Sequence, residues 1–286
     1  MMTIDQVHTI AVCGAGTMGA GIAEVAAGSG YNTVLFDIQA PMLDKARDQI
    51  IRNLESAVSK GRMTTSAMAA ILARIQFTSQ LQDCVAAVII EAIAERMEAK
   101  TALFRQLAAI NQADAILVSN TSSLSVSDIA AALPNPERVA GMHFFNPAPF
   151  MKLVEVVAGR NTHVSTTTLI RELAVRMGKT PVQVKDSPGF IVNRVARHYY
   201  LEAMKAAETG IADFAAIDRL LEGTGFRMGP FALMDLIGND VNLAVTQSLY
   251  EAFAKAPRFI PNALQITRVQ QGHLGRKSGR GFYSYE

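Results

Sequence analysis

Short apolar runs and longer mixed segments alternate along the first two-thirds of the chain. The apolar runs are rich in β-branched residues, which is typical of buried strands, and they lie at residues 7–13, 33–37, 75–79, 85–93, 116–120, 138–144, 152–157 and 181–185. The mixed segments, such as the one from Pro41 to Lys60, predict helices between the strands. Strands that alternate with helices predict a mainly parallel α/β sheet covered on both faces.

The pattern changes after Asp186, where strand-like runs almost disappear. Three segments with helical periodicity follow, separated by Gly, Pro and Asp, at residues 194–210, 213–223 and 231–256. The sequence therefore predicts an α/β domain at residues 1–185 and an all-helical domain at residues 186–286.

Composition narrows the class of protein further. Half of the 286 residues are hydrophobic and the net charge is only +2, so a large core is expected and nothing favours nucleic acid as a partner. Cys13 and Cys84 have no metal-ligand spacing and lie in apolar runs, which predicts buried free thiols in a reducing compartment and no metal site. The N-terminus lacks a signal pattern, and the run at 85–94 is too short for a bilayer and contains Glu91. A cytoplasmic protein without a membrane partner is expected.

A glycine-rich loop follows the first predicted strand. Gly14, Gly16 and Gly19 have the G-x-G-x-x-G spacing, with Thr17 and Met18 at the start of the following helix. These glycines allow a sharp turn, a close approach to a pyrophosphate and close helix packing, respectively. The motif in this strand–helix context predicts a Rossmann-type dinucleotide-binding domain.

An acidic residue at the end of the second strand indicates which dinucleotide is bound. Asp37 stands 23 residues after Gly14, where a carboxylate can accept hydrogen bonds from the ribose hydroxyls. Its charge would repel a 2′-phosphate, and the next residues, Ile38 and Gln39, provide no arginine for one. The sequence therefore favours NAD over NADP.

The stretch GMHFFNPAPFMKLVEVV at 141–157 carries candidate chemistry. His143 ends a predicted strand and Glu155 lies in the next one. A histidine in such a strand is more often a core residue than a catalyst, but ligands bind at the carboxyl ends of strands in these sheets, and hydride chemistry needs a base that works near neutral pH. We expect the turn at Asn146 to bring Glu155 back toward His143, and Phe144 and Phe145 to limit water around the imidazole.

At this point the sequence resembles the bacterial 3-hydroxyacyl-CoA dehydrogenase family. Besides the stretch at 141–157, the resemblance is carried from end to end of the chain by GAGTMGAGIA, VIIEAIAERMEAK, SNTSSLS, KDSPGFIVNR, MGPFALMDLIG and GRKSGRGFY. It implies the reversible oxidation of a 3-hydroxyacyl-CoA thioester, with 3-hydroxybutyryl-CoA expected, to the 3-ketoacyl-CoA. NAD would be the cofactor and the helical domain would form a homodimer.

The resemblance also implies a role for each matching residue. His143 matches the catalytic base, Glu155 its paired acid, and Ser122 a serine that hydrogen-bonds the reacting oxygen. Asn193 matches an asparagine near the substrate and the base. The remaining matches are contacts with the cofactor, at Glu95, Lys100, Asn120 and Ser122, and with CoA, at Asn53 and Lys60.

Several of these residues have simpler interpretations. Ser122 could only cap a helix, Glu155 could face water, and Glu95 with Lys100 could be a solvated helix pair. Alternative functions also remain at this point. They are a 3-hydroxyadipyl-CoA dehydrogenase, for which Arg227 could hold the distal carboxylate, a dehydrogenase of free β-hydroxyacids, and a non-catalytic, crystallin-like NAD-binding protein.

Overall fold

The computed structural model describes residues 2–285. The chain forms two compact units, Met1–Ser187 and Pro188–Glu286. The first contains a mainly parallel sheet with helices and the second is helical, which confirms the expected fold class. The division falls two residues beyond the boundary expected from the sequence.

One eight-stranded sheet forms the centre of the first unit. The strands are β1 (Thr9–Cys13), β2 (Asn32–Phe36), β3 (Ile75–Thr78), β4 (Val88–Glu91), β5 (Ile116–Ser119), β6 (Val139–Phe144), β7 (Leu153–Ala158) and β8 (Thr180–Lys185). Their order is β3-β2-β1-β4-β5-β6-β7-β8. All neighbouring pairs are parallel except β6 and β7, which are antiparallel.

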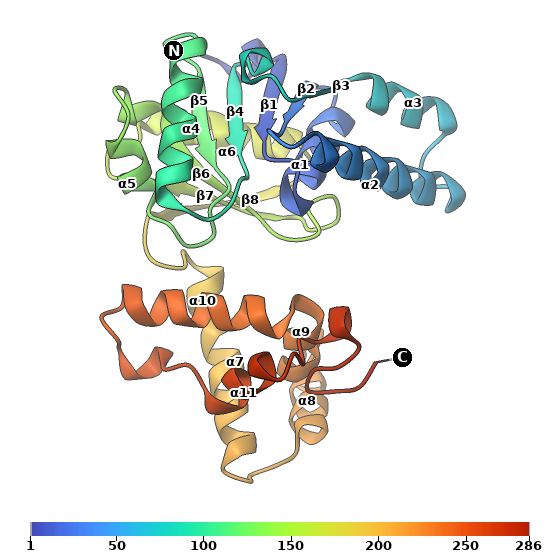
Figure 1. Ribbon diagram of the computed structural model, residues 1–286, viewed down its shortest axis with the longest axis vertical. Helices are drawn as coiled ribbons and strands as arrows, with labels where there is room; N and C mark the ends of the chain where they lie inside the picture. Colours follow the sequence, from blue (N-terminus) through green and yellow to red (C-terminus); the bar gives the residue numbers. More distant parts are fainter. Residues whose placement is uncertain (1, 286) are drawn as a thin grey trace. The chain divides into compact units, whose positions relative to one another are not determined.

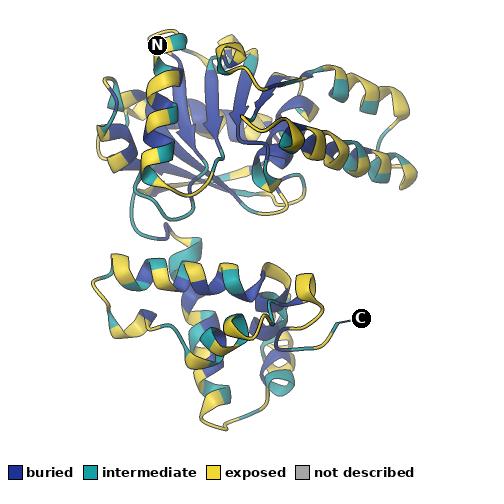
Figure 2. Cartoon of the chain, viewed as in Figure 1, coloured by how far each residue is buried: buried dark blue, intermediate teal, exposed yellow. Residues whose placement is uncertain are grey.

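Helices cover both faces of this sheet (Figure 1). The helices are α1 (Thr17–Gly28), α2 (Ala40–Ser59), α3 (Thr65–Ala73), α4 (Met97–Ile110), α5 (Val126–Ala131) and α6 (Val164–Arg176), with 3-10 turns at Ile4–Gln6, Leu81–Asp83 and Pro136–Arg138. Helices α1, α2, α3 and α6 share one hydrophobic core with the sheet. Figure 2 shows that the central strands are buried, whereas α2 and α3 have wide exposed surfaces. The outer strand β8 is largely exposed.

The strand order positions the ligand-binding edge of the sheet. Because β1 lies between β2 and β4, the chain crosses over at the β1–β4 boundary, and the loops that follow these two strands diverge there. Ligands of open α/β sheets bind at this kind of switch point, at the carboxyl ends of the strands. The glycine-rich loop follows β1 and residues 92–96 follow β4, so both lie at that edge.

Up to Tyr285, the last residue described, the second unit contains five α-helices and a structured tail. The helices are α7 (Val192–Glu208), α8 (Phe214–Gly223), α9 (Pro230–Ile237), α10 (Asn239–Ala252) and α11 (Ala263–Gln270), with 3-10 turns at Pro257–Phe259 and Arg276–Ser278. Phe214, Phe231 and Phe282 pack with ring centroids 4.6–5.2 Å apart and form the centre of its core. Aromatic pairs at this spacing add to the stability that their burial gives.

A buried carboxylate fastens the tail to α9. One oxygen of Asp235 accepts hydrogen bonds from Asn239 Nδ2 and the Phe282 backbone N–H, at 2.8 and 2.9 Å. The other accepts from the Tyr283 N–H at 2.9 Å and the Tyr285 hydroxyl at 3.0 Å. Burial and the hydrogen bond to Asp235 raise the pKa of Tyr285 to about 12, so this phenol stays protonated and donates.

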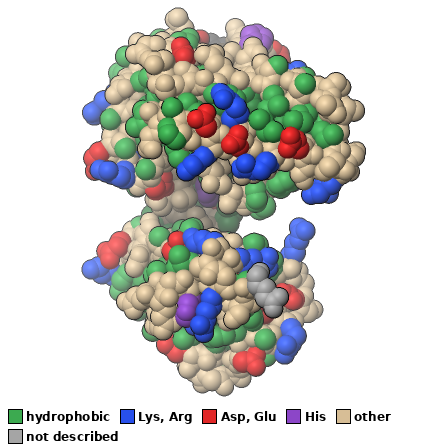
Figure 3. Space-filling model, turned by 45° about the vertical axis from the view of Figure 1, so that its right-hand side comes forward, with side chains coloured by type: hydrophobic (Ala, Val, Ile, Leu, Met, Phe, Trp, Pro, Cys, Tyr) green, Lys and Arg blue, Asp and Glu red, His purple; other side chains and the backbone are tan. Residues whose placement is uncertain are grey.

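The surface charges, the helix lengths and the two cysteines each bear on an expectation from the sequence. On the faces seen in Figure 3, acidic and basic side chains are interspersed. No helix within residues 2–285 combines the length and apolar character needed to cross a bilayer. Cys13 and Cys84 are buried free thiols, and the Cys13 thiol donates a hydrogen bond to Cys84 Sγ at 4.0 Å.

The Asp235 contacts generate a stability prediction. Replacing Asp235 by Asn should lower the free energy of unfolding by about 3 kcal/mol, because hydrogen bonds to a buried charge are among the strong ones. Urea denaturation of Asp235→Asn measures the loss. The control Glu251→Gln alters an exposed carboxylate 4.0 Å from Lys255 and should change stability little. Equal midpoints for both variants would contradict the role given to Asp235.

Candidate active site

The glycine-rich loop connects β1 to α1 so closely that side chains at two of its glycines would overlap the backbone. Gly14 has a φ of 107°, and a Cβ there would lie 2.6 Å from the carbonyl oxygen of Ala92. A Cβ on Gly19 would lie 1.7 Å from the carbonyl oxygen of Gly14. Gly16 differs, because a Cβ there would meet no atom within 4 Å. Open space therefore lies beside Gly16 at the N-terminus of α1, where backbone N–H groups favour a phosphate.

Asp37 is held beside this loop. Its carboxylate accepts a hydrogen bond from the Ala15 N–H at 2.8 Å and another from the Gln39 N–H at 2.9 Å. Each oxygen takes one of these bonds, and a carboxylate oxygen can accept a second donor. The geometry leaves Asp37 able to accept ribose hydroxyls while it is fixed to the glycine-rich loop.

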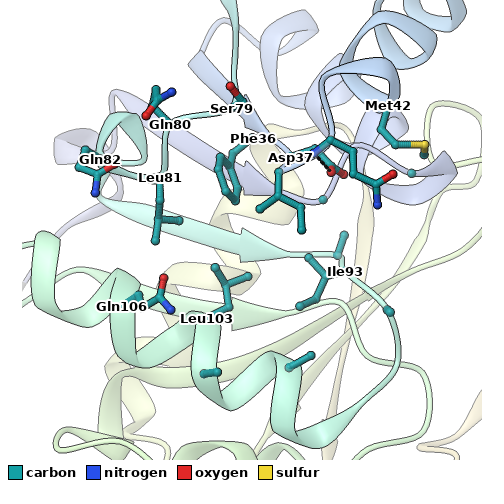
Figure 4. Close-up of a pocket in the computed structure, with 18 residues that line it drawn as sticks. Phe36, Asp37, Met42, Ser79, Gln80, Leu81, Gln82, Ile93, Leu103 and Gln106 are labelled. Carbon is teal, nitrogen blue, oxygen red and sulfur yellow. Dashed lines mark hydrogen bonds between the residues drawn. The ribbon is translucent and has the colours of Figure 1, made fainter.

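A cavity of about 750 Å³ lies over the ends of β1, β2 and β4. Figure 4 shows Phe36, Leu81, Ile93 and Leu103 near one another in its wall, with Asp37 close by. The other lining residues are Gly14, Gly16, Ile38, Gln39, Met42, Ser79, Gln80, Gln82, Ala92, Ala94, Ala99, Ala102 and Gln106. An apolar cavity that joins a carboxylate to a glycine loop fits the adenosine part of NAD, and the residues present could hold it.

His143 and Glu155 meet across the antiparallel pair of strands. They are direct register partners in β6 and β7, and His143 Nδ1 lies 2.8 Å from Glu155 Oε2. Glu155 is 1% exposed and His143 is 6% exposed. Glu155 therefore does not face water, and the simpler interpretation of this acid is wrong. A buried carboxylate at this distance fixes the orientation of the imidazole.

The two phenylalanines beside His143 have different positions. The ring of Phe145 lies against the imidazole, with centroids 4.5 Å apart. Phe144 follows His143 within β6 and is buried in the core with α1 and α6. Successive side chains of a strand point to opposite faces, so the expectation that both rings flank the imidazole is wrong for Phe144.

Glu95 holds the loop that contains Ser122. Its Oε1 accepts hydrogen bonds from the Thr121 hydroxyl at 2.6 Å, the Ser122 N–H at 2.9 Å, and the Ser123 N–H and hydroxyl at 3.1 and 3.0 Å. Burial raises the pKa of Glu95, but the charge of Lys100 and these hydrogen bonds outweigh it and hold the pKa below its usual range. The carboxylate therefore stays ionised at neutral pH. Ser122 is not the helix cap, because the side chain of Ser125 caps α5.

Lys100 is a buried residue and not part of a solvated pair. Its side chain is 1% exposed, and Nζ lies 2.6 Å from Glu91 Oε1 and 3.1 Å from Glu95 Oε2. No functional role was expected for Glu91, which is fully buried at the end of β4. The signal that could have found it is an acid inside an apolar strand, since a buried carboxylate needs a partner.

The other candidate residues occupy several elements of the two units. Asn120 precedes the Ser122 loop, and its Oδ1 accepts the Phe144 N–H at 2.9 Å. Thr17 and Met18 form the first turn of α1. Asn193 lies in the first turn of α7 in the helical unit.

The proposed CoA contacts lie on or after α2. Asn53 is in this helix, and Lys60 is the exposed residue that ends it. The Asn53 amide donates to Glu24 Oε2 and accepts from Gln49, both at 2.8 Å. Lys60 is seven positions after Asn53, so the two residues lie two turns apart on the same side of the helix.

Comparison with known proteins identifies the class. Residues 9–187 match the family model described as the NAD binding domain of 3-hydroxyacyl-CoA dehydrogenase. Residues 189–285 match the C-terminal domain of the same family. The chain belongs to the 3-hydroxyacyl-CoA dehydrogenase family, a class of NAD-dependent oxidoreductases, which confirms the resemblance and the cofactor expected from the sequence.

The names of similar proteins differ in the acyl group of the substrate. A 3-hydroxyadipyl-CoA dehydrogenase of Escherichia coli is 50% identical over 98% of this chain, which spans 59% of that relative's length. A probable 3-hydroxybutyryl-CoA dehydrogenase of Deinococcus radiodurans is 41% identical over 96% of this chain and 99% of its own length. A solved structure of E. coli 3-hydroxybutyryl-CoA dehydrogenase has a TM-score of 0.95 and is 48% identical, covering 98% of this chain and 60% of that one.

The spacing around the glycines generates a paired prediction. Gly16→Ala should fold normally, because its Cβ enters open space, but should weaken NADH binding on the order of ten-fold by crowding the phosphate. Gly19→Ala should lose about 3 kcal/mol of stability, because its Cβ overlaps a backbone oxygen. Thermal unfolding and NADH titration by fluorescence separate the two effects. Normal NADH affinity in Gly16→Ala would contradict a phosphate at this position.

Proposed function

We propose that this protein catalyses the reversible NAD-dependent oxidation of a 3-hydroxyacyl-CoA thioester to a 3-ketoacyl-CoA. The observation that carries the proposal is the buried contact of 2.8 Å between His143 and Glu155, at the same edge of the sheet as the glycine-rich loop. Membership of the 3-hydroxyacyl-CoA dehydrogenase family supports it.

His143 serves as the base in the direction of oxidation. Glu155 accepts the Nδ1 proton, which leaves Nε2 as the atom that takes the proton of the substrate's 3-hydroxyl. When bound, NAD would supply the acceptor for the hydride that leaves C3 of the substrate. The imidazolium formed on His143 is stabilised by the adjacent carboxylate, and in the reverse direction it returns the proton to the ketone oxygen.

Two further polar residues are assigned to orienting the reacting group. Ser122 is proposed to hydrogen-bond the reacting oxygen, and Glu95 supports this assignment because it fixes the Ser122 backbone through its N–H at 2.9 Å. Asn193 is proposed as a further substrate contact. Orientation of this kind contributes to rate by holding the reactants close to the geometry of the reaction.

The proposed binding residues divide between cofactor and CoA. Asp37, with Gly14 and Gly16, would bind the adenosine end of NAD and disfavour NADP. Asn53 and Lys60 would contact the CoA part of the substrate. For the helical unit we propose a homodimer, supported by large apolar side chains on its surface, including Ile211, Leu220 and Phe226, which are 77%, 68% and 51% exposed.

Two acyl groups deserve a direct comparison. The names of relatives favour either a 3-hydroxybutyryl or a 3-hydroxyadipyl thioester. The second needs a cation for its distal carboxylate, and Arg227, the candidate chosen from the sequence, is exposed. We propose the hydroxybutyryl thioester as the better substrate, in cytoplasmic fatty-acid metabolism, and the hydroxyadipyl thioester as the second candidate.

Acetoacetyl-CoA with NADH tests the reaction and the base together. Wild-type chain should oxidise NADH, and His143→Ala should lower kcat by ~10²–10⁴ while NADH binding stays near normal. The absorbance of NADH measures turnover and its fluorescence measures binding. His8→Ala, which alters an exposed histidine, is the control and should keep full kcat.

Three outcomes of this assay are informative. Bound NADH without turnover by the wild-type chain would support a non-catalytic NAD-binding protein. No turnover of acetoacetyl-CoA, together with turnover of free 3-hydroxyacids and NAD in a parallel assay, would support a β-hydroxyacid dehydrogenase. An unchanged kcat in His143→Ala would remove the base from the mechanism.

Steady-state rates with a pair of thioesters test the acyl group. We expect kcat/KM for 3-hydroxybutyryl-CoA to exceed that for 3-hydroxyadipyl-CoA by about ten-fold or more, because burying an unpaired carboxylate is costly. A preference in the other direction would replace the first candidate by the second. In that case Arg227→Ala should reduce turnover of the hydroxyadipyl thioester selectively.

A further inference from the structure

Glu91 is a fully buried acid for which the proposed chemistry has no direct use. One oxygen accepts hydrogen bonds from Lys100 Nζ at 2.6 Å and from the Ile93 N–H at 2.7 Å. The other accepts from the Ser119 hydroxyl at 2.7 Å. Burying a carboxylate costs several kcal/mol unless such partners are supplied, so a fully partnered acid at this position calls for an explanation.

The position of Glu91 in the sheet suggests its purpose. It is the last residue of β4, and its register partners are Cys13, at the end of β1, and Ser119, at the end of β5. The glycine-rich loop begins after Cys13, and the loop with Ser122 begins after Ser119. Glu91 therefore lies between the two loops that build the proposed site.

Lys100 connects Glu91 to the outer part of the site. Its ammonium group faces three protein oxygens, at 2.6 Å on Glu91, 3.1 Å on Glu95 and 3.5 Å on the Ile93 carbonyl. An ammonium group has three protons, so these contacts use its donors. Lys100 thus acts on a ligand through its neighbours, chiefly Glu95, whose side chain is 34% exposed.

The contacts continue from Glu95 into the Ser122 loop. Glu95 accepts the N–H groups of Ser122 and Ser123, so an unbroken series of hydrogen bonds and ion pairs runs from the buried end of β4 to this loop. Two carboxylates share one ammonium group here. Without the inner carboxylate, Lys100 would be balanced by Glu95 alone and would draw it away from the loop.

We propose that Glu91 is a positioning residue, which holds Lys100 so that Glu95 fixes the backbone of Ser122 for catalysis. The part concerning turnover rests on the proposed function. A second consequence does not, because Ile93, whose N–H is held by Glu91, lines the cavity over the glycine-rich loop. Loss of Glu91 should therefore also weaken NADH binding.

The test compares Glu91→Gln with a matched loss of another buried charge. Arg138 is buried at the opposite edge of the same sheet, just before β6, and donates to the carbonyls of Gln112, Ala113 and Ala115. Arg138→Met should lower Tm but leave kcat and NADH affinity unchanged. Glu91→Gln should lower kcat by ~10², as expected for a displaced active-site group, and also raise the Kd for NADH.

The double variant Glu91→Gln with Lys100→Met separates positioning from stability. It removes both buried charges, so Tm should recover relative to Glu91→Gln, whereas kcat should stay low because Glu95 has lost its ammonium partner. The double variant also keeps the proposal testable if Glu91→Gln alone does not fold. Recovery of kcat together with Tm, or a Glu91→Gln variant that loses only Tm, would overturn the proposal.

The readouts distinguish failure of this inference from failure of the proposed function. If the wild-type chain does not reduce acetoacetyl-CoA, the proposed function fails and NADH affinity alone tests Glu91. Weaker NADH binding in Glu91→Gln and in the double variant, with normal binding in Arg138→Met, supports the inference. Equal NADH affinity in all four proteins contradicts it.

Discussion

The proposed chemistry depends on a single hydrogen bond across two antiparallel strands. His143 and Glu155 are both buried and would be costly there as isolated groups, but each satisfies the other at 2.8 Å. The reversal of direction between β6 and β7 makes this possible, because it places the two residues directly opposite each other. A turn that changed the register by one residue would send one of the two side chains to the opposite face of the sheet.

The parallel part of the sheet supplies the rest of the site. Strands β1, β4 and β5 end side by side, so three loops far apart in the sequence meet at one edge. Glu91 and Lys100 connect the loops that follow β4 and β5 through Glu95, while Asp37 holds the loop that follows β1 through the Ala15 N–H. The edge is therefore organised by buried polar contacts as well as by hydrophobic packing, and such contacts specify geometry when all partners are satisfied.

Much of this arrangement could be predicted from the sequence because it follows local rules. Glycine spacing and strand–helix alternation predicted the dinucleotide fold, and the family resemblance pointed to His143 and Glu155. Burial was harder to predict. Lys100 and Glu95 are close in sequence and look like a surface pair, and only the packing of α4 against β4 places the ammonium group beside Glu91.

Strand alternation also distinguishes residues that look equivalent in the sequence. Phe144 and Phe145 are neighbours of the same type, yet Phe144 packs in the hydrophobic core and Phe145 packs against the imidazole of His143. The face of each residue depends on where β6 ends, and a sequence pattern does not locate strand ends to the nearest residue. The acyl preference is undetermined by sequence for a different reason, since it depends on how a pocket accommodates a single distal group.

The most direct test of the central claim is the tautomer of His143. Nitrogen-15 spectra of the histidine rings, assigned by comparison with His143→Ala, report which ring nitrogen carries the proton in the neutral form. Our account predicts a proton on Nδ1, donated to Glu155, and a shift toward the other tautomer in Glu155→Gln. A neutral ring protonated on Nε2 in the wild-type chain would contradict the account, because that nitrogen could not then accept the substrate's proton.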